Sequence, residues 1–305
     1  MDTVSTVVRT STHEFGPGLF IDVTWPAQAP DGLPIIVWLH GGGWRMQDRT
    51  ARPDLLRDFA VHDYVMASID YRLAPATRHP GQLHDVRAAV RWLRTHAAEF
   101  GADPGRIGLW GSSAGGHLAA LTGLHSGVDR LPGEGPTQVS SGVAAVVDGY
   151  GPADLTKAGA GSPEADLLGG PAAERPQQAR DVSPVAHAGP DAPPFLILHG
   201  LDDAMVPAAH SIALYAALEG AGNDAALYLI DGFGHGFLNP GDVLELGPGQ
   251  SLDQGHLERE PQAPTAVRST ARLRAFTARH RHASFPTIEA FFAHTLKDHT
   301  SKDVP

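Results

Sequence analysis

Ser113 stands at the centre of the sequence Gly111-Ser112-Ser113-Ala114-Gly115. A serine hydroxyl is a weak nucleophile, and it attacks a carbonyl carbon only when it is exposed and held beside a base. Small residues two positions before and after the serine allow the sharp strand-to-helix turn that exposes such a hydroxyl. An apolar run over 106–110 precedes the motif, and a helical pattern over 113–125 follows it. These features indicate that Ser113 is a nucleophile for acyl transfer.

A base and an acid for this chemistry follow further along the chain. His235 lies in the segment 232–237, directly after an apolar run, and Asp202 and Asp203 lie just after another apolar run. A neutral imidazole can take the proton of the serine when a carboxylate holds its other nitrogen. The order serine, acid, histidine is that of serine hydrolases whose nucleophile sits on a strand–turn–helix unit. Both aspartates are candidates for the acid on this reasoning.

A glycine-rich segment, His40-Gly41-Gly42-Gly43-Trp44, follows the apolar run 33–39. Acyl transfer places negative charge on the carbonyl oxygen of the substrate, and backbone N–H groups aimed at that oxygen stabilise it. Glycines present N–H groups without side chains in the way. The alternative is a plain glycine turn with no catalytic role. Trp44 either lines the substrate pocket or packs beneath this turn.

All four segments follow short apolar runs, and helical patterns separate many of these runs. Continuous apolar runs are typical of strands that are buried on both faces of a parallel sheet. We therefore predict an α/β protein with a mostly parallel, doubly wound sheet of about eight strands flanked by helices. The predicted strands are 19–25, 33–39, 64–70, 106–110, 143–148, 195–199 and 225–230, and the predicted helices are 83–100, 113–125, 208–220 and 285–296.

Composition excludes several classes of function. The 305 residues carry 23 basic and 34 acidic side chains, a formal net charge of −11 that repels nucleic acid. The absence of cysteine excludes thiolate nucleophiles and disulfides, and 17 histidines without an H-E-x-x-H motif do not predict a zinc site. We expect no metal and no cofactor. The chain shows no signal peptide and no membrane-spanning run, so we expect a cytoplasmic protein.

Four motifs together resemble one known family: HGGGW at 40–44, DYRLAP at 70–75, GSSAG at 111–115 and GHGF at 234–237. The chain resembles α/β-hydrolase esterases of the hormone-sensitive-lipase-like group, and it is also similar to arylformamidases, which share an HGG-x-W signature. The resemblance covers about 33–237 and resumes at Phe285.

The resemblance implies a role for each matching residue. It implies Ser113 as the nucleophile, His235 as the base and Asp203 as the acid. Asp203 is preferred to Asp202 because its spacing from Gly200 and from Val206-Pro207 is that of the family. The resemblance also implies that the backbone N–H groups of Gly42, Gly43 and Ala114 form the oxyanion hole.

Other polar residues near these motifs are interpreted as structural. Asp70 and Arg72 are expected to pair and to hold loops in place. His40, His117 and His199 are expected to be packed, hydrogen-bonded histidines rather than a second base.

The leading functional prediction is a serine carboxylesterase that cleaves small-molecule or short-chain esters through an acyl-enzyme. The alternatives are amide hydrolysis of the arylformamidase kind, and acyl transfer or lactone chemistry in a biosynthetic pathway. A non-catalytic ligand receptor on the same fold is a further alternative, but such receptors usually lose a member of the triad, and His235 is present here.

Two long segments interrupt the alternation of strands and helices. We interpret residues 1–305 as a single domain in which 156–191 and 239–284 are cap or lid insertions. The segment 239–284 is the part that the family pattern does not explain. We expect a short amphipathic helix within it, around Val267 to Phe276, and we leave open whether the segment is a lid, a homodimer contact or disordered.

Overall fold

The structure is a computed structural model, and it describes residues 7–240 and 252–297. A nine-stranded sheet runs through these residues in the order β1-β2-β4-β3-β5-β6-β7-β8-β9. The central strands from β4 to β8 are parallel, while β1, β2 and β9 are antiparallel to their neighbours. The strands are β1 (Val8–Gly16), β2 (Leu19–Pro26), β3 (Leu33–Leu39), β4 (Val65–Ile69), β5 (Ala102–Ser112), β6 (Ala145–Gly149), β7 (Phe195–Gly200), β8 (Ala225–Ile230) and β9 (Thr265–Ser269).

The strand order reverses direction between β3 and β5. After β3 the chain moves outward to β4, and after β5 it moves the other way through β6, β7 and β8. The loops that follow β3 and β5 therefore diverge at their shared carboxyl edge. Ligand sites in open α/β sheets form at such a switch point. The segment 40–44 follows β3, and Ser113 follows β5.

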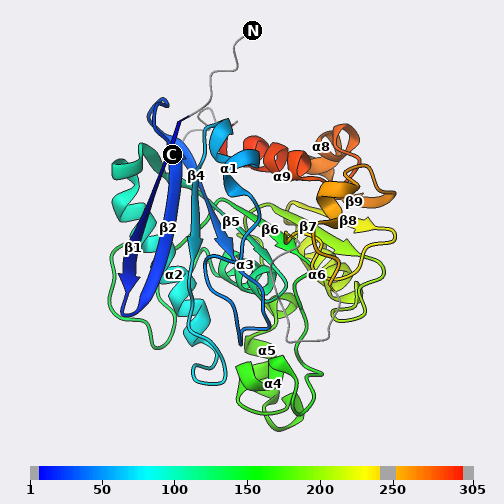
Figure 1. Cartoon of the computed structure of the whole chain (residues 1–305). Coiled ribbons are helices and arrows are strands. Elements are labelled where there is room, and N and C mark those ends of the chain that lie inside the picture. Colours follow the sequence, from blue (N-terminus) through cyan, green and yellow to red (C-terminus); the bar gives the residue numbers. More distant parts are fainter. Residues whose placement is uncertain (1–6, 241–251, 298–305) are drawn as a thin grey trace.

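Helices cover both faces of the sheet (Figure 1). Val37 belongs to the core cluster that includes Leu118 and Leu214, whereas Trp38 belongs to the cluster that includes Phe291. Successive side chains of a strand point to opposite faces, so each strand supplies both clusters, and this explains its continuous apolar run. One face carries α2 (Gly81–His96), α3 (Ala114–Leu124) and α6 (Ala209–Gly220), and the other carries α1 (Leu55–Asp58), α8 (Arg274–Arg279) and α9 (Phe285–Phe292).

The segment 156–191 forms two short helices at the bottom of Figure 1, away from α1, α8 and α9 at the top. They are α4 (Pro163–Leu168) and α5 (Pro176–Asp181). Ser162 caps α4, since its hydroxyl accepts the N–H of Ala165, and Pro163 occupies the first helical position, where no N–H is needed. The remaining described elements are α7 (His256–Arg259), the 3₁₀ turns Ala60–His62, Ala97–Phe100, Ala172–Glu174, Pro184–Ala186 and Ala271–Leu273, and the π-helical turn Ala293–Lys297.

The two edge strands β1 and β9 are additions to the strands that the sequence predicts. β1 pairs antiparallel with β2 and is only partly buried, so its sequence shows no apolar run. β9 lies where we expected the start of an amphipathic helix, because the outer edge of β8 offers a ladder of hydrogen bonds there. The helix is reduced to α8, in which Phe276 is buried in the core together with Leu273, the residue that precedes the helix.

The segment 239–284 was expected to be a lid, a subunit contact or disordered, and a place in the sheet was not among these alternatives. Its residues 241–251 lie outside the described part of the chain.

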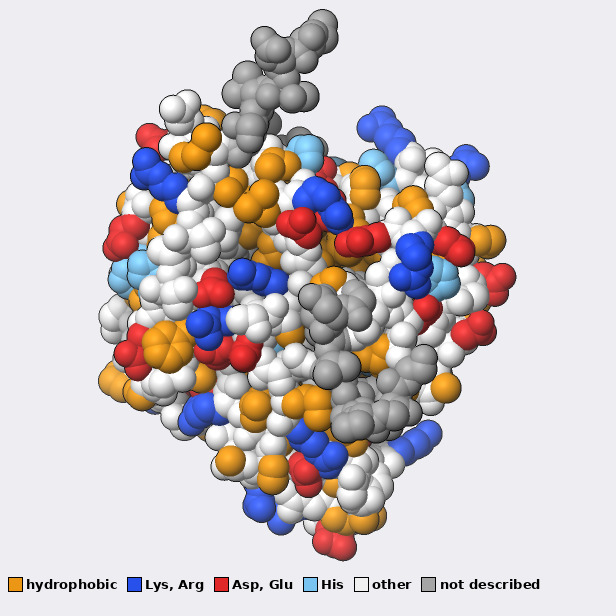
Figure 2. Space-filling view, in the orientation of Figure 1, with side chains coloured by type: hydrophobic (Ala, Val, Ile, Leu, Met, Phe, Trp, Pro, Cys, Tyr) orange, Lys and Arg blue, Asp and Glu red, His pale blue; other side chains and the backbone are white. Residues whose placement is uncertain are grey.

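The surface carries charges of both signs. On the face shown in Figure 2, Lys and Arg side chains are interspersed with Asp and Glu rather than gathered in one stripe. In the described residues, the search for helices found none long and apolar enough to cross a membrane. Among the same residues, no cluster of three or more His, Cys, Asp or Glu side chains has the arrangement of a metal site.

Candidate active site

Ser113 lies on a tight turn between β5 and α3. Its backbone has φ 53° and ψ −120°, a conformation that residues with side chains rarely adopt. The glycines of the motif make the turn sterically feasible. A Cβ on Gly111 would lie 2.3 Å from the carbonyl oxygen of Gly115, and a Cβ on Gly115 would lie 2.0 Å from that of Leu39. The backbone N–H of Ser113 donates to the carbonyl of Gly149 at 2.8 Å, which ties the turn to the end of β6.

Ser113, His235 and Asp203 form a continuous chain of hydrogen bonds. His235 Nε2 lies 2.9 Å from Ser113 Oγ, and His235 Nδ1 lies 2.6 Å from Asp203 Oδ2. An ionised carboxylate can only accept, so Nδ1 carries the proton and Nε2 is left to accept the hydroxyl proton of Ser113. The sequence separates these residues by up to 122 positions, and the fold brings all three together.

The carboxylate of Asp203 is buried and held from several sides. Its Oδ1 accepts the backbone N–H groups of Met205 and Val206 at 2.9 and 2.8 Å. Burial by itself would raise the pKa of Asp203, but the hydrogen bonds from His199 and His235 outweigh burial and lower this pKa below its usual value. The neighbouring Asp202 is exposed and contacts the His235 loop through its backbone N–H.

The segment 40–44 forms a turn beside Ser113. Gly42 and Gly43 have φ values of 92° and 59°, which favour glycine, and a Cβ on Gly42 would lie 2.5 Å from the carbonyl of Met46. In the described part of the chain, the N–H groups of these two glycines donate to no other group. Ala114 is the first residue of α3, where a helix leaves its N–H groups without intrahelical partners.

The DYRLAP segment supports this turn through Tyr71, whose hydroxyl donates to the carbonyls of His40 and Gly41 at 2.8 and 3.1 Å. The ring of Tyr71 also stacks on His40 at 4.1 Å. Asp70 and Arg72 do hold loops, but they do not pair with each other.

Asp70 and Arg72 each form an ion pair with a residue from another part of the fold. Asp70 pairs with Arg49 at 3.2 Å, and Arg72 pairs with Asp85 of α2 at 2.7 Å. Both residues lie beyond Ile69, the last residue of β4, and each is already held by a partner of opposite charge from elsewhere in the chain.

These features match a known family. A family model described as BD-FAE matches residues 21–218. The chain belongs to the BD-FAE family. Among curated proteins of Mycobacterium tuberculosis, esterase LipC is 34% identical over 215 residues, which are 67% of this chain and 53% of LipC. Esterase LipQ is 33% identical over 233 residues, 72% of this chain and 55% of LipQ. The chain thus spans about half the length of these curated relatives.

Solved structures of esterases share the fold of this BD-FAE protein. A thermophilic esterase from Thermogutta terrifontis, Est2 with propionate bound, has a TM-score of 0.66 and 29% identity, over 76% of this chain and 87% of Est2. A truncated carbohydrate esterase from gut microbiota also has a TM-score of 0.66, with 30% identity over 70% of this chain and 83% of its own. The nine-stranded, mostly parallel sheet is therefore that of an α/β-hydrolase, as the sequence predicts.

Trp44 is 1% exposed and packs edge-on against His117, with ring centroids 5.0 Å apart. Its indole presents almost no surface to a ligand. Of the two roles that the sequence allows, this placement favours packing beneath the glycine turn.

The three other histidines near the site are packed. Burial lowers the pKa of both His40 and His117 to about 4, so each is neutral near neutral pH. His199 is fully buried, and its ring nitrogens lie within hydrogen-bond distance of Ser211 Oγ and of the carbonyl of Val206.

Two residues at this site were missed from the sequence. Tyr150 has a positive φ of 44°, and its ring packs edge-on against His235 and Phe237. Its position just after β6 could have identified Tyr150 from the sequence, because the other site residues also follow strands.

Arg45, next to the glycine turn, donates to the carbonyl of Ser162 at 2.8 Å and pairs with Asp166 of α4 at 2.8 Å. Arg45 thereby ties the segment 156–191 to the glycine turn.

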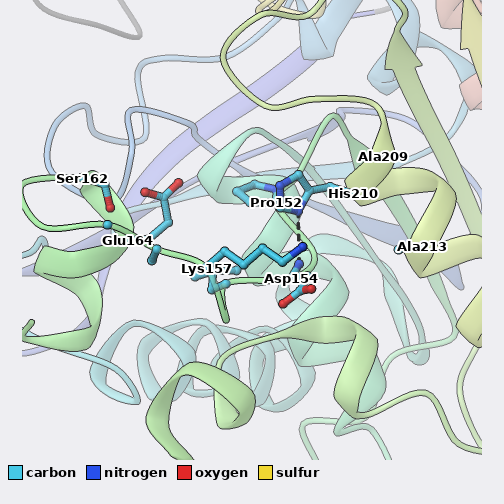
Figure 3. A pocket seen from close by; sticks show the side chains of 11 residues that line it. Pro152, Asp154, Lys157, Ser162, Glu164, Ala209, His210 and Ala213 are labelled. Atoms are coloured by element: carbon cyan, nitrogen blue, oxygen red, sulfur yellow. Dashed lines mark hydrogen bonds between the residues drawn. The ribbon is translucent and has the colours of Figure 1, made fainter. Parts of the chain in front are cut away.

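A cavity of about 440 Å³ lies between this segment and the first turns of α6 (Figure 3). The glycine turn approaches the segment that supplies part of this lining. A Cβ on Gly43 would lie 3.2 Å from Pro163, which stands between the lining residues Ser162 and Glu164. Glu164, Lys157 and His210 bring charged or polar groups from three positions to this cavity.

The tautomer of His210 follows from its contacts. The backbone N–H groups of Ala153 and Asp154 both donate to Nδ1 at 3.2 Å, so the ring proton is on Nε2. Burial lowers the pKa of His210, which also favours the neutral ring.

Proposed function

We propose that this chain is a serine carboxylesterase that works through an acyl-enzyme. The observation that carries the proposal is the hydrogen-bonded chain from Ser113 through His235 to Asp203. The names of the curated relatives and of the solved structures, all esterases, support the same reaction.

In the proposed mechanism, Ser113 Oγ attacks the carbonyl carbon of the ester while His235 Nε2 takes the hydroxyl proton. Asp203 holds the imidazole in the required tautomer and stabilises the imidazolium that forms. The carbonyl oxygen becomes an oxyanion, and the N–H groups of Gly42, Gly43 and Ala114 are the proposed donors to it. His235 then gives the proton to the departing alcohol oxygen, and a water molecule, activated by the same imidazole, releases the acid from Ser113.

The proposed substrate is a small ester with a short acyl group. Structures of the Thermogutta terrifontis esterase are described as propionate-bound and butyrate-bound, which supports short acyl groups for this chain as well. We expect acetyl to butyryl esters to react faster than esters with a chain of about twelve carbons, which need a larger apolar trough.

The cavity shown in Figure 3 is the proposed place for the alcohol portion of the ester. His210 Nε2 and Lys157 are donors there, and Glu164 is an acceptor, so an alcohol with additional hydrogen-bonding groups fits this cavity better than a purely apolar one. The two short helices of the segment 156–191 act as a cap on a single domain in this proposal. The homodimer contact remains the open alternative that the sequence left, and the expected cytoplasmic location stays a prediction.

The deciding experiment compares wild type with Ser113→Ala on acetyl and butyryl nitrophenyl esters, with N-formylkynurenine as the amide substrate. We expect ester turnover by wild type, and its loss in Ser113→Ala with an unchanged circular dichroism spectrum. An organophosphonate should label Ser113, as located by mass spectrometry of the peptides. Labelling at another serine, or faster turnover of the amide than of the esters, would contradict the proposal.

A further inference from the structure

Asp253 holds the loop that carries His235 at two points. Asp253 Oδ2 accepts the backbone N–H of Gly234 at 2.8 Å, and the backbone N–H of Asp253 donates to the carbonyl of His235 at 2.7 Å. The two bonds fix the loop through the N–H of Gly234 and the carbonyl of His235.

His256 completes this arrangement. Its Nδ1 lies 2.7 Å from Asp253 Oδ2, so the same carboxylate oxygen that holds Gly234 is itself held by an imidazole. The ring of His256 stacks on Phe233, with ring centroids 3.8 Å apart and planes 8° apart. Phe233 is fully buried and directly precedes Gly234. Asp253 and His256 therefore contact three consecutive residues that end at His235.

The His235 loop needs such support because its own sequence is permissive. Glycine occupies positions 232, 234 and 236, and glycine leaves the backbone free to adopt many conformations. The imidazole must nevertheless lie within hydrogen-bond distance of both Ser113 Oγ and Asp203 Oδ2. Further bonds from the same outer segment support the loop, from Gly255 N–H to the carbonyl of Asn239 and from Leu257 N–H to that of Phe237.

We propose that Asp253 is a positioning residue for His235, and that His256 supports it by fixing its carboxylate. The proposal rests on the ester hydrolysis proposed above. It also assigns a role to residues 253–257 of the segment that the family resemblance leaves unexplained. Misplacing a reacting group by about 1 Å can reduce a rate by about 100-fold, so loss of this support should lower kcat rather than substrate binding.

The first test compares Asp253→Ala with Asp253→Asn. For Asp253→Ala we expect kcat to fall by about 10-fold to 100-fold, with KM within about twofold of wild type. Asp253→Asn should recover part of the loss. Its amide oxygen can still accept the N–H of Gly234 and the hydrogen bond from His256 Nδ1, but without the charge. The matched control is Asp231→Ala, which removes an exposed carboxylate close to the same loop and should leave both constants unchanged.

A second pair of variants keeps the test informative if Asp253→Ala does not fold. His256→Phe keeps a ring that can stack on Phe233 but loses the bond to Asp253, whereas His256→Ala loses both. We expect a moderate fall in kcat for His256→Phe and a larger fall for His256→Ala. Wild-type kcat in folded Asp253→Ala, or in both His256 variants, would overturn the proposal. So would an equal loss in Asp231→Ala.

A readout that does not require ester hydrolysis separates this proposal from the proposed function. The proton between His235 Nδ1 and Asp203 should give a low-field proton NMR signal, assigned by its loss in His235→Ala. We expect this signal to broaden in Asp253→Ala and to remain sharp in Asp231→Ala. If wild type cleaves no ester but the signal behaves in this way, the positioning role stands and the esterase function fails. If esters are cleaved and the signal and kcat of Asp253→Ala are unchanged, the positioning role fails alone.

Discussion

His199 Nε2 lies 3.4 Å from Asp203 Oδ2, the oxygen that also lies 2.6 Å from His235 Nδ1. One carboxylate oxygen therefore faces two imidazoles. The ring of His199 is fixed by its contacts with Ser211 and Val206, whereas the ring of His235 faces Ser113. The contacts from both rings lower the pKa of Asp203 despite its burial. The acid consequently remains ionised at neutral pH.

Replacement of this acid should be far more damaging than replacement of its neighbour. Asp203→Asn should lower kcat by about 10⁴-fold, because an amide in this position favours the wrong tautomer of the imidazole. Asp202→Asn should change kcat little, since Asp202 is exposed and touches the loop only through its backbone. Steady-state kinetics on an acetyl nitrophenyl ester measure both variants, and the reverse ranking would overturn the assignment of the acid.

Asp148, at the end of β6, should make stability depend on pH. Its Oδ1 accepts the N–H of Gly151, while Oδ2 is buried without a hydrogen-bond partner among the described residues. Burial raises the pKa of Asp148 to about 6. The folded protein thus keeps this proton up to about pH 6, whereas the unfolded chain releases it near pH 4, so stability falls as pH rises between these values.

Asp148→Asn removes the titration. On going from about pH 4 to about pH 8, the free energy of unfolding of wild type should fall by about 1–3 kcal/mol relative to that of the variant. Urea denaturation at both pH values measures this difference. Parallel pH curves for the two proteins would show that the buried carboxyl does not titrate in this way.

Gly115 should tolerate no side chain. A Cβ there would lie 2.0 Å from the carbonyl oxygen of Leu39 and 2.5 Å from that of His40, and backbone atoms cannot move aside as the end of a flexible side chain can. Gly115→Ala should lower the free energy of unfolding by about 3 kcal/mol or more. Gly127→Ala is the matched control, because a Cβ there meets nothing within 4 Å. Thermal denaturation checks both, and similar midpoints for the two variants would contradict this account of the turn.

Arg45 should affect the cap more than the chemistry. Arg45→Ala removes its bonds to the segment 156–191, so KM for esters with large polar alcohols should rise several-fold while labelling of Ser113 by a small organophosphonate stays unchanged. Asp166→Asn should have a smaller effect, because it removes only an ion pair that is partly exposed and the carbonyl contacts remain. A slower labelling rate with unchanged KM would place Arg45 in the chemistry instead.

Much of the central sheet could be predicted because each strand is buried on both faces. A strand such as β3 or β8 must be apolar throughout, and its predicted bounds agree with the structure. The edge strands differ, since β9 reads Thr-Ala-Val-Arg-Ser and needs hydrogen bonds from only one neighbour. Local composition carries no signal for that pairing.

The candidate site likewise contains residues that the sequence predicts and residues that it does not. The geometry at Gly115 demands one residue type, so the motif around Ser113 is visible in the sequence. Asp253 contributes one carboxylate oxygen and one backbone N–H, and many residues in many loops do the same. Its relation to His235 arises from the path of the chain between them, which periodicity and composition do not describe.

The antiparallel strand β9 also has a consequence for the behaviour of the chain in solution. β8, with the sequence Ala-Ala-Leu-Tyr-Leu-Ile, is fully buried, and without β9 its outer row of N–H and carbonyl groups would be an open template for another chain. β9 covers that row with a strand of five residues, of which Ala266 and Arg268 are exposed. A short strand with a cation on its surface is a poor partner for further strand addition. The sheet therefore ends on this side in a strand that discourages aggregation.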